Sequence, residues 1–227
     1  MHSFRLPRDD QRVAIMGRTG SGKTVFGAWL LAKSNFMKVP RVIVDYKGDA
    51  LLNSIDRIEE VGFNTVPKRG GLYIIRPLIH DADAMEAWLW KVWERENIGL
   101  YFDEAFMLPN SGHQRRGALQ AILTQGRSKT IPVISLVQRP SQISLFVFSE
   151  ADYYAVFHLN RWQDKKTVQD LAEQLDPKRL EKLKEYHSHW YDVGKDKLFS
   201  MLPAPKPEIV AEQIDTKLKP KRRHYRG

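Results

Sequence analysis

The 227-residue sequence contains no cysteine, so disulfide bonds and cysteine-ligated zinc sites are excluded. It has no apolar run of about 20 residues, the length that a membrane-spanning helix needs. The first residues lack the apolar core of a secretory signal peptide, and no internal repeat is visible. Because this length supplies one sizeable hydrophobic core and is short for two, we expect one globular domain.

Acidic residues are absent from the segment 217–227, and this absence explains most of the net charge of +9. The basic residues of the segment are Lys217, Lys219, Lys221, Arg222, Arg223 and Arg226. Without these six, the remaining 30 basic and 27 acidic residues leave a net charge of only +3. Two interpretations remain open: a tail that binds nucleic acid or another polyanion, or a solvated chain end.

The most informative stretch is Gly-Arg-Thr-Gly-Ser-Gly-Lys-Thr at 17–24, which fits the phosphate-loop pattern G-x-x-x-x-G-K-[ST] at every fixed position. The apolar run 13–16 before it has strand length, and 25–32 after it has a helical pattern, which argues against a plain glycine-rich turn. In such a loop, backbone N–H groups converge on an anion, Lys23 neutralises the β- and γ-phosphates, and the Thr24 hydroxyl holds Mg²⁺. We therefore expect ATP and Mg²⁺ as cofactors. The expected nucleotide-binding residues are Gly17, Arg18, Thr19, Gly20, Ser21, Gly22, Lys23, Thr24 and Val25.

Strand patterns alternate with helical patterns along the chain, which predicts an α/β fold with a largely parallel sheet flanked by helices. Further strands are expected at 41–45, 72–75, 98–104, 131–137 and 153–159, helices at 81–97, 114–126, 165–175 and 177–186, and a C-terminal β-hairpin at 189–193 and 197–201. The predicted organisation is a lead-in at 1–10, an ATPase domain at 11–202, and a proline-containing linker with a basic tail at 203–227. Asp45 and Lys47, at the end of one strand, either line the site or form an ordinary strand-end turn.

Two acids, Asp103 and Glu104, end the strand expected at 98–104, and at least one strand should separate them from the phosphate loop. An aspartate in this position holds Mg²⁺, and a neighbouring glutamate can deprotonate the attacking water as general base. Gln138, at the end of a later strand, is a candidate sensor of the γ-phosphate or holder of that water. Arg127 is a candidate for stabilising charge on the transferred phosphoryl group, often from a neighbouring subunit.

The order of these elements resembles the FtsK–HerA superfamily of ring-forming DNA-translocating ATPases. The resemblance rests on the phosphate loop, on Val-Asp-Tyr-Lys-Gly at 44–48, Tyr-Phe-Asp-Glu at 101–104, Gly-Arg at 126–127 and Val-Gln-Arg-Pro-Ser at 137–141, and it covers about 11–200. It implies a RecA-like fold of the additional-strand, catalytic-glutamate (ASCE) class, with Gln138 as sensor and Arg127 acting across the subunit interface.

Within that superfamily the chain is minimal, and its size is similar to the genome-packaging ATPases of tailless viruses, including the internal-membrane phages. This implies double-stranded DNA as substrate, a homo-oligomeric ring with a hexamer as the expected size, and capsid or portal-vertex proteins as partners. It also implies the host cytoplasm and the packaging vertex of the virion as locations, without a membrane span. The polar stretch 109–116, with Arg115 and Arg116, is either a pore loop that touches DNA phosphates or a plain loop.

Other functions are compatible with a phosphate loop. An ATPase for virion assembly or protein secretion usually carries a membrane segment, which the sequence does not show. A nucleotide-gated scaffold with little turnover would not need both Asp103 and Glu104. A small-molecule kinase would need an acceptor pocket and an arginine-rich lid, and neither is recognisable.

Overall fold

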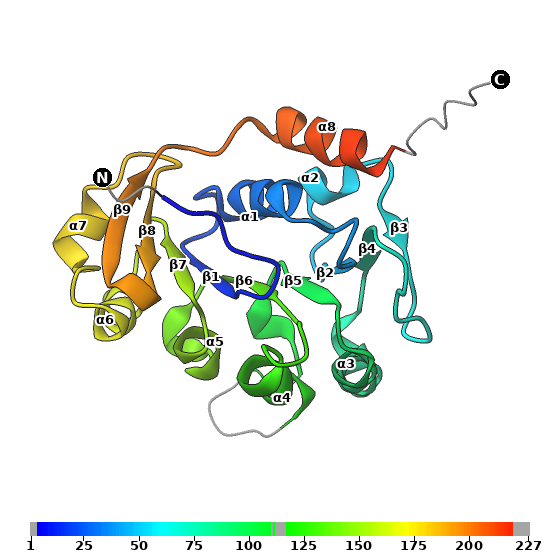
Figure 1. Cartoon of the computed structure of the whole chain (residues 1–227). Helices are drawn as coiled ribbons and strands as arrows, with labels where there is room; N and C mark the ends of the chain where they lie inside the picture. Colours follow the sequence, from blue (N-terminus) through cyan, green and yellow to red (C-terminus); the bar gives the residue numbers. More distant parts are fainter. Residues whose placement is uncertain (1–3, 110, 112–116, 220–227) are drawn as a thin grey trace.

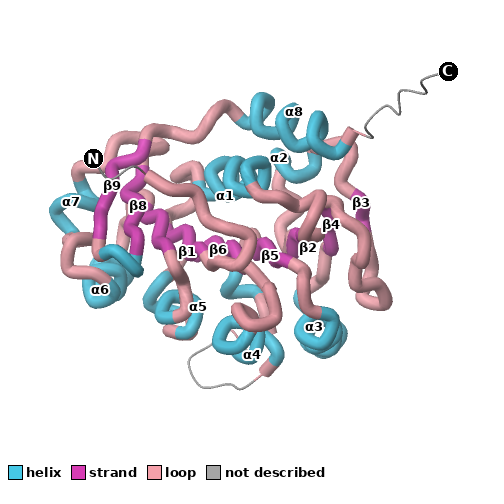
Figure 2. The backbone as a smooth tube through the Cα atoms, in the orientation of Figure 1, coloured by secondary structure: helices cyan, strands magenta, loops and turns pink. Residues whose placement is uncertain are grey.

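The computed structural model describes residues 4–109, 111 and 117–219, and within them nine strands form a single sheet flanked by helices (Figures 1 and 2). The strands are β1 (Val13–Met16), β2 (Arg41–Val44), β3 (Glu59–Glu60), β4 (Leu72–Ile75), β5 (Gly99–Phe102), β6 (Val133–Val137), β7 (Tyr153–Val156), β8 (Ser188–Asp192) and β9 (Lys197–Met201). The helices are α1 (Lys23–Lys33), α2 (Ala50–Asn53), α3 (Ala82–Arg95), α4 (Ala118–Gln125), α5 (Phe146–Ser149), α6 (Trp162–Leu171), α7 (Pro177–Glu181) and α8 (Pro207–Leu218).

The strand order is β3-β4-β2-β5-β6-β1-β7-β8-β9, and the pairs from β3 through β7 are all parallel. The hairpin β8–β9 adds two antiparallel strands at one edge, beside β7. The central strands are short and mostly apolar, and every residue in them is buried, as expected for parallel strands covered on both faces. The predicted fold class, an α/β fold with a largely parallel sheet and a C-terminal hairpin, is confirmed.

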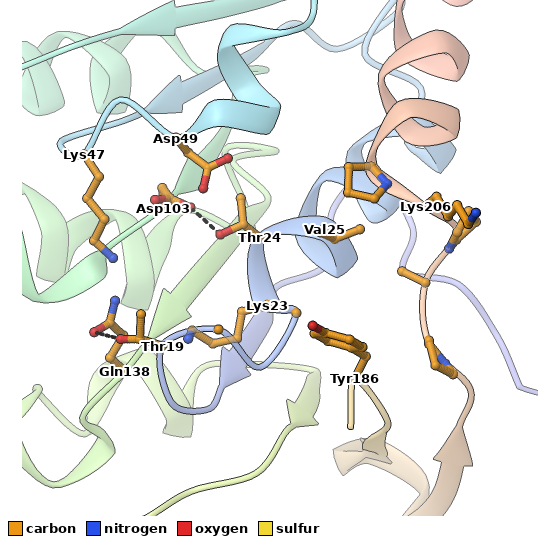
Figure 3. A pocket seen from close by; sticks show the side chains of 16 residues that line it. Thr19, Lys23, Thr24, Val25, Lys47, Asp49, Asp103, Gln138, Tyr186 and Lys206 are labelled. Carbon is orange, nitrogen blue, oxygen red and sulfur yellow. Dashed lines mark hydrogen bonds between the residues drawn. The ribbon is translucent and has the colours of Figure 1, made fainter. Parts of the chain in front are cut away.

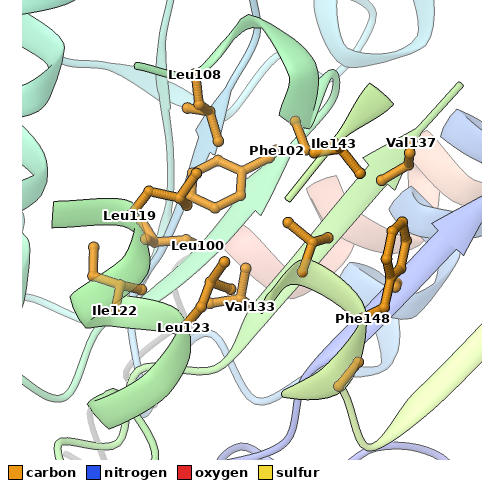
Figure 4. Packing of buried hydrophobic residues seen from close by; sticks show 14 of the residues in the cluster. Leu100, Phe102, Leu108, Leu119, Ile122, Leu123, Val133, Val137, Ile143 and Phe148 are labelled. Atoms are coloured by element: carbon orange, nitrogen blue, oxygen red, sulfur yellow. The ribbon is translucent and has the colours of Figure 1, made fainter. Parts of the chain in front are cut away.

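Two layers of helices cover the sheet (Figure 1). One apolar cluster joins α1, α2 and α8 to one face, and the other joins α3, α4 and further helices to the opposite face. Figure 4 shows the second cluster, in which Leu119, Ile122 and Leu123 of α4 pack against Phe102 of β5 and Val133 of β6. Burial on both faces holds the strands in a fixed register, so the loops at their ends begin at fixed positions.

Helix α8 lies inside the segment that the sequence predicts to be a linker and tail. Val210 and Ile214, one turn apart, are fully buried, and the helix packs along α1. At its end, the Lys217 ammonium donates hydrogen bonds to the carbonyls of Ala32 (3.1 Å) and Ser34, at the C-terminus of α1. Pro207 is at the first turn of the helix, where proline is tolerated, so here it marks a helix start rather than an irregular linker.

The topology brings the ends of β1, β5 and β6 together at one edge of the sheet. Strand β6 lies between β1, which leads into the phosphate loop, and β5, which leads into the two acids, so the prediction of an intervening strand is confirmed. Ligands of open parallel sheets bind at this carboxyl edge. None of the helices within 4–109 and 117–219 has the length and apolar character that crossing a bilayer requires.

Candidate active site

The phosphate loop is hydrogen-bonded to the ends of the two strands that flank β1. The Gly17 N–H donates to the carbonyl of Val137 at the end of β6 (3.1 Å), and the Arg18 N–H donates to the carbonyl of His158 after β7 (2.9 Å). Gly17 has no room for a side chain, because a Cβ there would lie 2.6 Å from the Cβ of Phe157. The first glycine of the motif is therefore required by close packing against the sheet.

The loop ends at Gly22, which starts helix α1 in a left-handed backbone conformation (φ 97°) that favours glycine. No side chain caps the helix there, so its first N–H groups and the positive end of its dipole are available to an anion. The Lys23 ammonium donates to the Arg18 carbonyl (2.8 Å) and is almost completely buried. Burial lowers the pKa of Lys23 to about 8, against the opposing effect of Glu104. A cation in this position is poorly solvated, and an anionic ligand would relieve that cost.

The next side chain, Thr24, reaches across to the first acid. Its hydroxyl donates to Asp103 Oδ1 (3.2 Å), and Asp103 is 3% exposed. Burial raises the pKa of Asp103 to about 6, and the nearby carboxylates Asp49 and Asp45 add to the rise while Lys47 opposes it. A hydroxyl and a carboxylate side by side are the oxygen ligands that Mg²⁺ accepts, with phosphates and waters completing its shell. Within the described residues, no group of three or more His, Cys, Asp or Glu side chains could hold a metal ion by itself.

The second acid, Glu104, is held by a lysine from the turn that follows β2. Lys47 Nζ lies 2.7 Å from Glu104 Oε2, and the glutamate is 6% exposed. Within the described part of the chain, the other oxygen, Glu104 Oε1, is buried and has no hydrogen-bond partner. A buried carboxylate oxygen without a donor is an unfilled acceptor position, and a water molecule is the simplest donor to fill it.

The structure separates the roles that the sequence left open for Asp45 and Lys47. The Asp45 carboxylate accepts hydrogen bonds from the backbone N–H groups of Lys47 (3.1 Å), Gly48 (2.9 Å) and Asp49 (3.2 Å). Asp45 therefore shapes the strand-end turn, and that turn carries Lys47 and Asp49 to the site.

The third polar strand end belongs to β6. Gln138 accepts a hydrogen bond from the Thr19 hydroxyl of the phosphate loop (3.1 Å between Oγ1 and Oε1). The residues after it are fixed to α6 through Asp164, which receives the Arg139 guanidinium (3.0 Å) and the Ser141 hydroxyl (2.7 Å). Asp164 was not expected from the sequence, where it directly precedes the helix predicted at 165–175, and it stabilises the turn that positions Gln138.

Arg127 does not join this group. It follows α4 and precedes β6, and it pairs with Asp152, which directly precedes β7. Because β1, β6 and β7 are parallel, the N-terminal ends of these strands lie at the edge opposite the phosphate loop. The guanidinium is more than half exposed at that opposite edge. Arg127 therefore cannot reach the phosphate loop of its own chain.

A cavity of about 670 Å³ opens above the phosphate loop, large enough for a nucleotide (Figure 3). Among the predicted site residues, those that line it are Thr19, Gly20, Gly22, Lys23, Thr24, Val25, Asp103 and Gln138. Gly17, Arg18, Ser21 and Glu104 are not among the lining residues, and within the loop the Ser21 hydroxyl donates to the Arg18 carbonyl (2.8 Å). Sequence reasoning missed Asp49, Tyr186 and the segment 203–207 as lining residues. Three prolines in five residues were the available signal for that segment, since they indicate a preformed extended backbone.

Two of the sequence predictions lie outside the described residues. Arg115 and Arg116 of the stretch 109–116 fall there, and so does the end of the basic tail at 220–227.

No protein-family model matches the sequence. The DNA packaging ATPase P9 of Enterobacteria phage PRD1 is 38% identical over 226 residues, which cover 94% of this chain and 96% of P9.

Among solved structures, the genome packaging NTPase B204 of Sulfolobus turreted icosahedral virus 2, in complex with AMPPCP, has a TM-score of 0.68 at 18% identity, and the match covers 87% of this chain and 100% of B204. EssC (ATPases 2 and 3) of Geobacillus thermodenitrificans has a TM-score of 0.62 at 15% identity, with 92% of this chain and 44% of EssC covered. These structures share the fold, whereas the match to P9 extends along nearly the whole sequence of both proteins. The chain therefore belongs to the family of the phage DNA packaging ATPase P9.

Proposed function

We propose that this packaging ATPase is a ring-forming motor of the FtsK–HerA superfamily that drives double-stranded DNA into a preformed capsid by hydrolysing ATP. The observation that carries the proposal is the meeting of Lys23, Thr24 and Asp103 at one cavity, with Glu104 paired to Lys47, a lysine that lines the same cavity. Phosphate binding alone would need the loop but neither acid. The two acids, one beside the Thr24 hydroxyl and one with a free oxygen, support hydrolysis.

Nucleotide binding is assigned to the phosphate loop. The N–H groups at the start of α1 and the Lys23 ammonium would hold the β- and γ-phosphates of ATP, which replace the Arg18 carbonyl as partner of Lys23. Thr24 and Asp103 would hold Mg²⁺, whose charge offsets that of the phosphates when it is bound. The two side chains are in contact, so little rearrangement would bring both onto one ion.

Glu104 is the proposed general base. Its Oε2 is fixed by Lys47, which leaves Oε1 to accept the proton of the attacking water. Gln138 is the proposed sensor, because its amide oxygen contacts the Thr19 hydroxyl and its place at the end of β6 faces the cavity. A change at the phosphates would reach the turn after β6 through this contact, and from there α6 through Asp164.

The ring is proposed because Arg127, the candidate catalytic arginine, lies away from the phosphate loop of its own chain. Arg127 lies at the opposite edge of the sheet, so it can act only on the site of a neighbouring subunit, and a closed ring with six subunits would repeat that contact at every interface. Capsid or portal-vertex proteins are the proposed partners, and the host cytoplasm and the packaging vertex of the virion are the proposed locations. The basic tail would add contacts to DNA phosphates.

The test is ATP hydrolysis by the full chain with and without double-stranded DNA, in the presence of Mg²⁺. Stimulation by DNA, absent from a Glu104→Gln control, is the expected result. Turnover that DNA leaves unchanged, together with no retention of DNA by the protein, would contradict DNA translocation and favour a protein substrate. Native mass spectrometry with a non-hydrolysable ATP analogue and DNA measures the ring size directly.

A further inference from the structure

The cavity above the phosphate loop has two chemically different ends (Figure 3). One end carries the charged and hydrogen-bonding groups already described, from Lys23 to Gln138. The other end is formed by Val25 in the first turn of α1, by Tyr186, and by the segment 203–207. We refer to this segment, Pro-Ala-Pro-Lys-Pro, as the proline strap.

Tyr186 presents an aromatic ring to this second end. The side chain is 49% exposed, although the ring lies against the phosphate loop, where a Cβ on Gly22 would be 3.3 Å from Tyr186 Cδ1. Its backbone is left-handed (φ 59°), a conformation that residues other than glycine rarely adopt. Strained backbone at a ligand cavity is held by its surroundings and often serves the ligand. Figure 3 shows the ring between the phosphate loop and Lys206 of the strap.

The proline strap is fixed at both ends. It follows β9, and it leads into α8, which is anchored on α1 by the buried side chain of Val210 and by the hydrogen bonds of Lys217. Proline rings restrict the backbone between these anchors. The strap is therefore a preformed apolar wall, and a ligand that touches it pays little ordering entropy.

We propose that Tyr186 and the proline strap bind the base of the nucleotide, with the base stacked on the tyrosine ring. The inference rests on the proposed function, since it assumes that the triphosphate occupies the phosphate loop. Once Lys23 and Thr24 hold the phosphates, the rest of the nucleotide must lie further along the cavity. The base is flat, aromatic and uncharged, and the second end offers an aromatic ring, a valine side chain and proline rings. Aromatic rings stack on any nucleobase, because each base has a π-face.

The test compares Tyr186→Asn with Tyr186→Phe. Asparagine tolerates a left-handed backbone, so it removes the ring without adding strain, and phenylalanine keeps the ring. We expect Tyr186→Asn to raise KM for ATP by about 5- to 150-fold, the range that one base–aromatic stack provides, with kcat changed less than about twofold. Tyr186→Phe should stay close to wild type. Inhibition by inorganic tripolyphosphate, which has no base, should be equal in all three proteins.

Trp162→Ala is the matched control, because Trp162 is a more exposed aromatic residue outside the cavity lining. Pro205→Gly tests the strap and, like Tyr186→Asn, should raise KM for ATP. The proposal is overturned if Tyr186→Asn binds ATP like wild type, or if it loses ATP and tripolyphosphate in parallel, since the ring would then support the loop rather than the base. If wild-type protein hydrolyses no ATP, the proposed function itself fails, and this outcome is distinct from both.

Discussion

The buried carboxylate of Asp103 should destabilise the nucleotide-free protein at neutral pH. Burial raises its pKa from 3.8 to about 6. The folded state therefore binds the proton more tightly than the unfolded state between these two values. The difference of about 2.2 in pKa corresponds to roughly 3 kcal/mol of lost unfolding free energy above pH 6, and the loss disappears as the pH falls toward 3.8.

The perturbation is Asp103→Asn, which removes the charge and keeps an oxygen for the Thr24 hydroxyl. At pH 7.5, with EDTA and without nucleotide, we expect the variant to be more stable than wild type by up to roughly 3 kcal/mol, or roughly 6–12 °C in Tm. Urea titrations of both proteins from pH 7.5 to pH 4 should show the difference shrink toward zero. Groups that titrate equally in both proteins contribute equally at each pH, so their contributions cancel in the difference in unfolding free energy.

A second buried aspartate supplies the control. Asp164 is 2% exposed, but it receives the Arg139 guanidinium (3.0 Å) and the Ser141 hydroxyl (2.7 Å), so Asp164→Asn should destabilise the protein by leaving a cation without its partner. Adding ATP with Mg²⁺ should stabilise wild type and leave Asp103→Asn nearly unchanged. The reasoning would be refuted if Asp103→Asn were less stable than wild type at pH 7.5, or if its gain in unfolding free energy did not change with pH.

The remaining predictions concern turnover, assembly and DNA binding. Glu104→Gln should bind ATP with near-normal affinity in an equilibrium titration but hydrolyse it slowly, because an amide cannot take the proton; wild-type turnover would mean that another group is the base. Arg127→Ala should lose about a thousandfold in kcat, and mixing it with Lys23→Ala should restore part of the ATPase activity, since some interfaces then join an intact loop to an intact arginine. If mixed rings show no ATPase activity although one wild-type subunit added to inactive rings does hydrolyse ATP, Arg127 does not act in trans. If that single wild-type subunit is also inactive, the ring requires every site to be intact. Deleting 220–227, which carries four basic residues, should lower the salt-dependence slope of DNA binding by up to about 3.6 and leave basal turnover intact; an unchanged slope would assign the tail to another partner.

Much of the fold was predictable because its signals are local. The apolar runs at 13–16 and 72–75 are strands with the predicted bounds, and the phosphate loop required a strand before it and a helix after it. The bounds of other elements shifted by a few residues, as for α6, which begins at Trp162 rather than at 165. Helix α5 was not predicted, because at one turn it is too short to show a helical period.

Other parts depend on contacts between distant segments, and no local pattern encodes them. The pairing of Lys47 with Glu104 requires β2 and β5 to be neighbours, and 57 residues separate the two side chains in sequence. Helix α8 was hidden by the prolines before it and by the charges after it, and its stability comes from burial against α1. Lys217 therefore caps α1, and only the later basic residues remain as candidates for binding DNA.

The position of Arg127 determines how neighbouring subunits would have to be oriented in a ring. Strands β1 and β6 are four and five residues long, so the two edges of the sheet are roughly 13–17 Å apart at a rise of about 3.3 Å per residue. A side chain that pairs with Asp152 at one edge cannot also approach phosphates at the other. If Arg127 takes part in hydrolysis, the N-terminal edge of one subunit must face the carboxyl edge of the next, which is a head-to-tail contact that closes only as a ring. In that ring Arg127 would exchange Asp152 for the charge on a neighbour's nucleotide, so assembly and turnover would be coupled through one ion pair. Complementation between Arg127→Ala and Lys23→Ala therefore reads out the packing of subunits as well as the role of one residue.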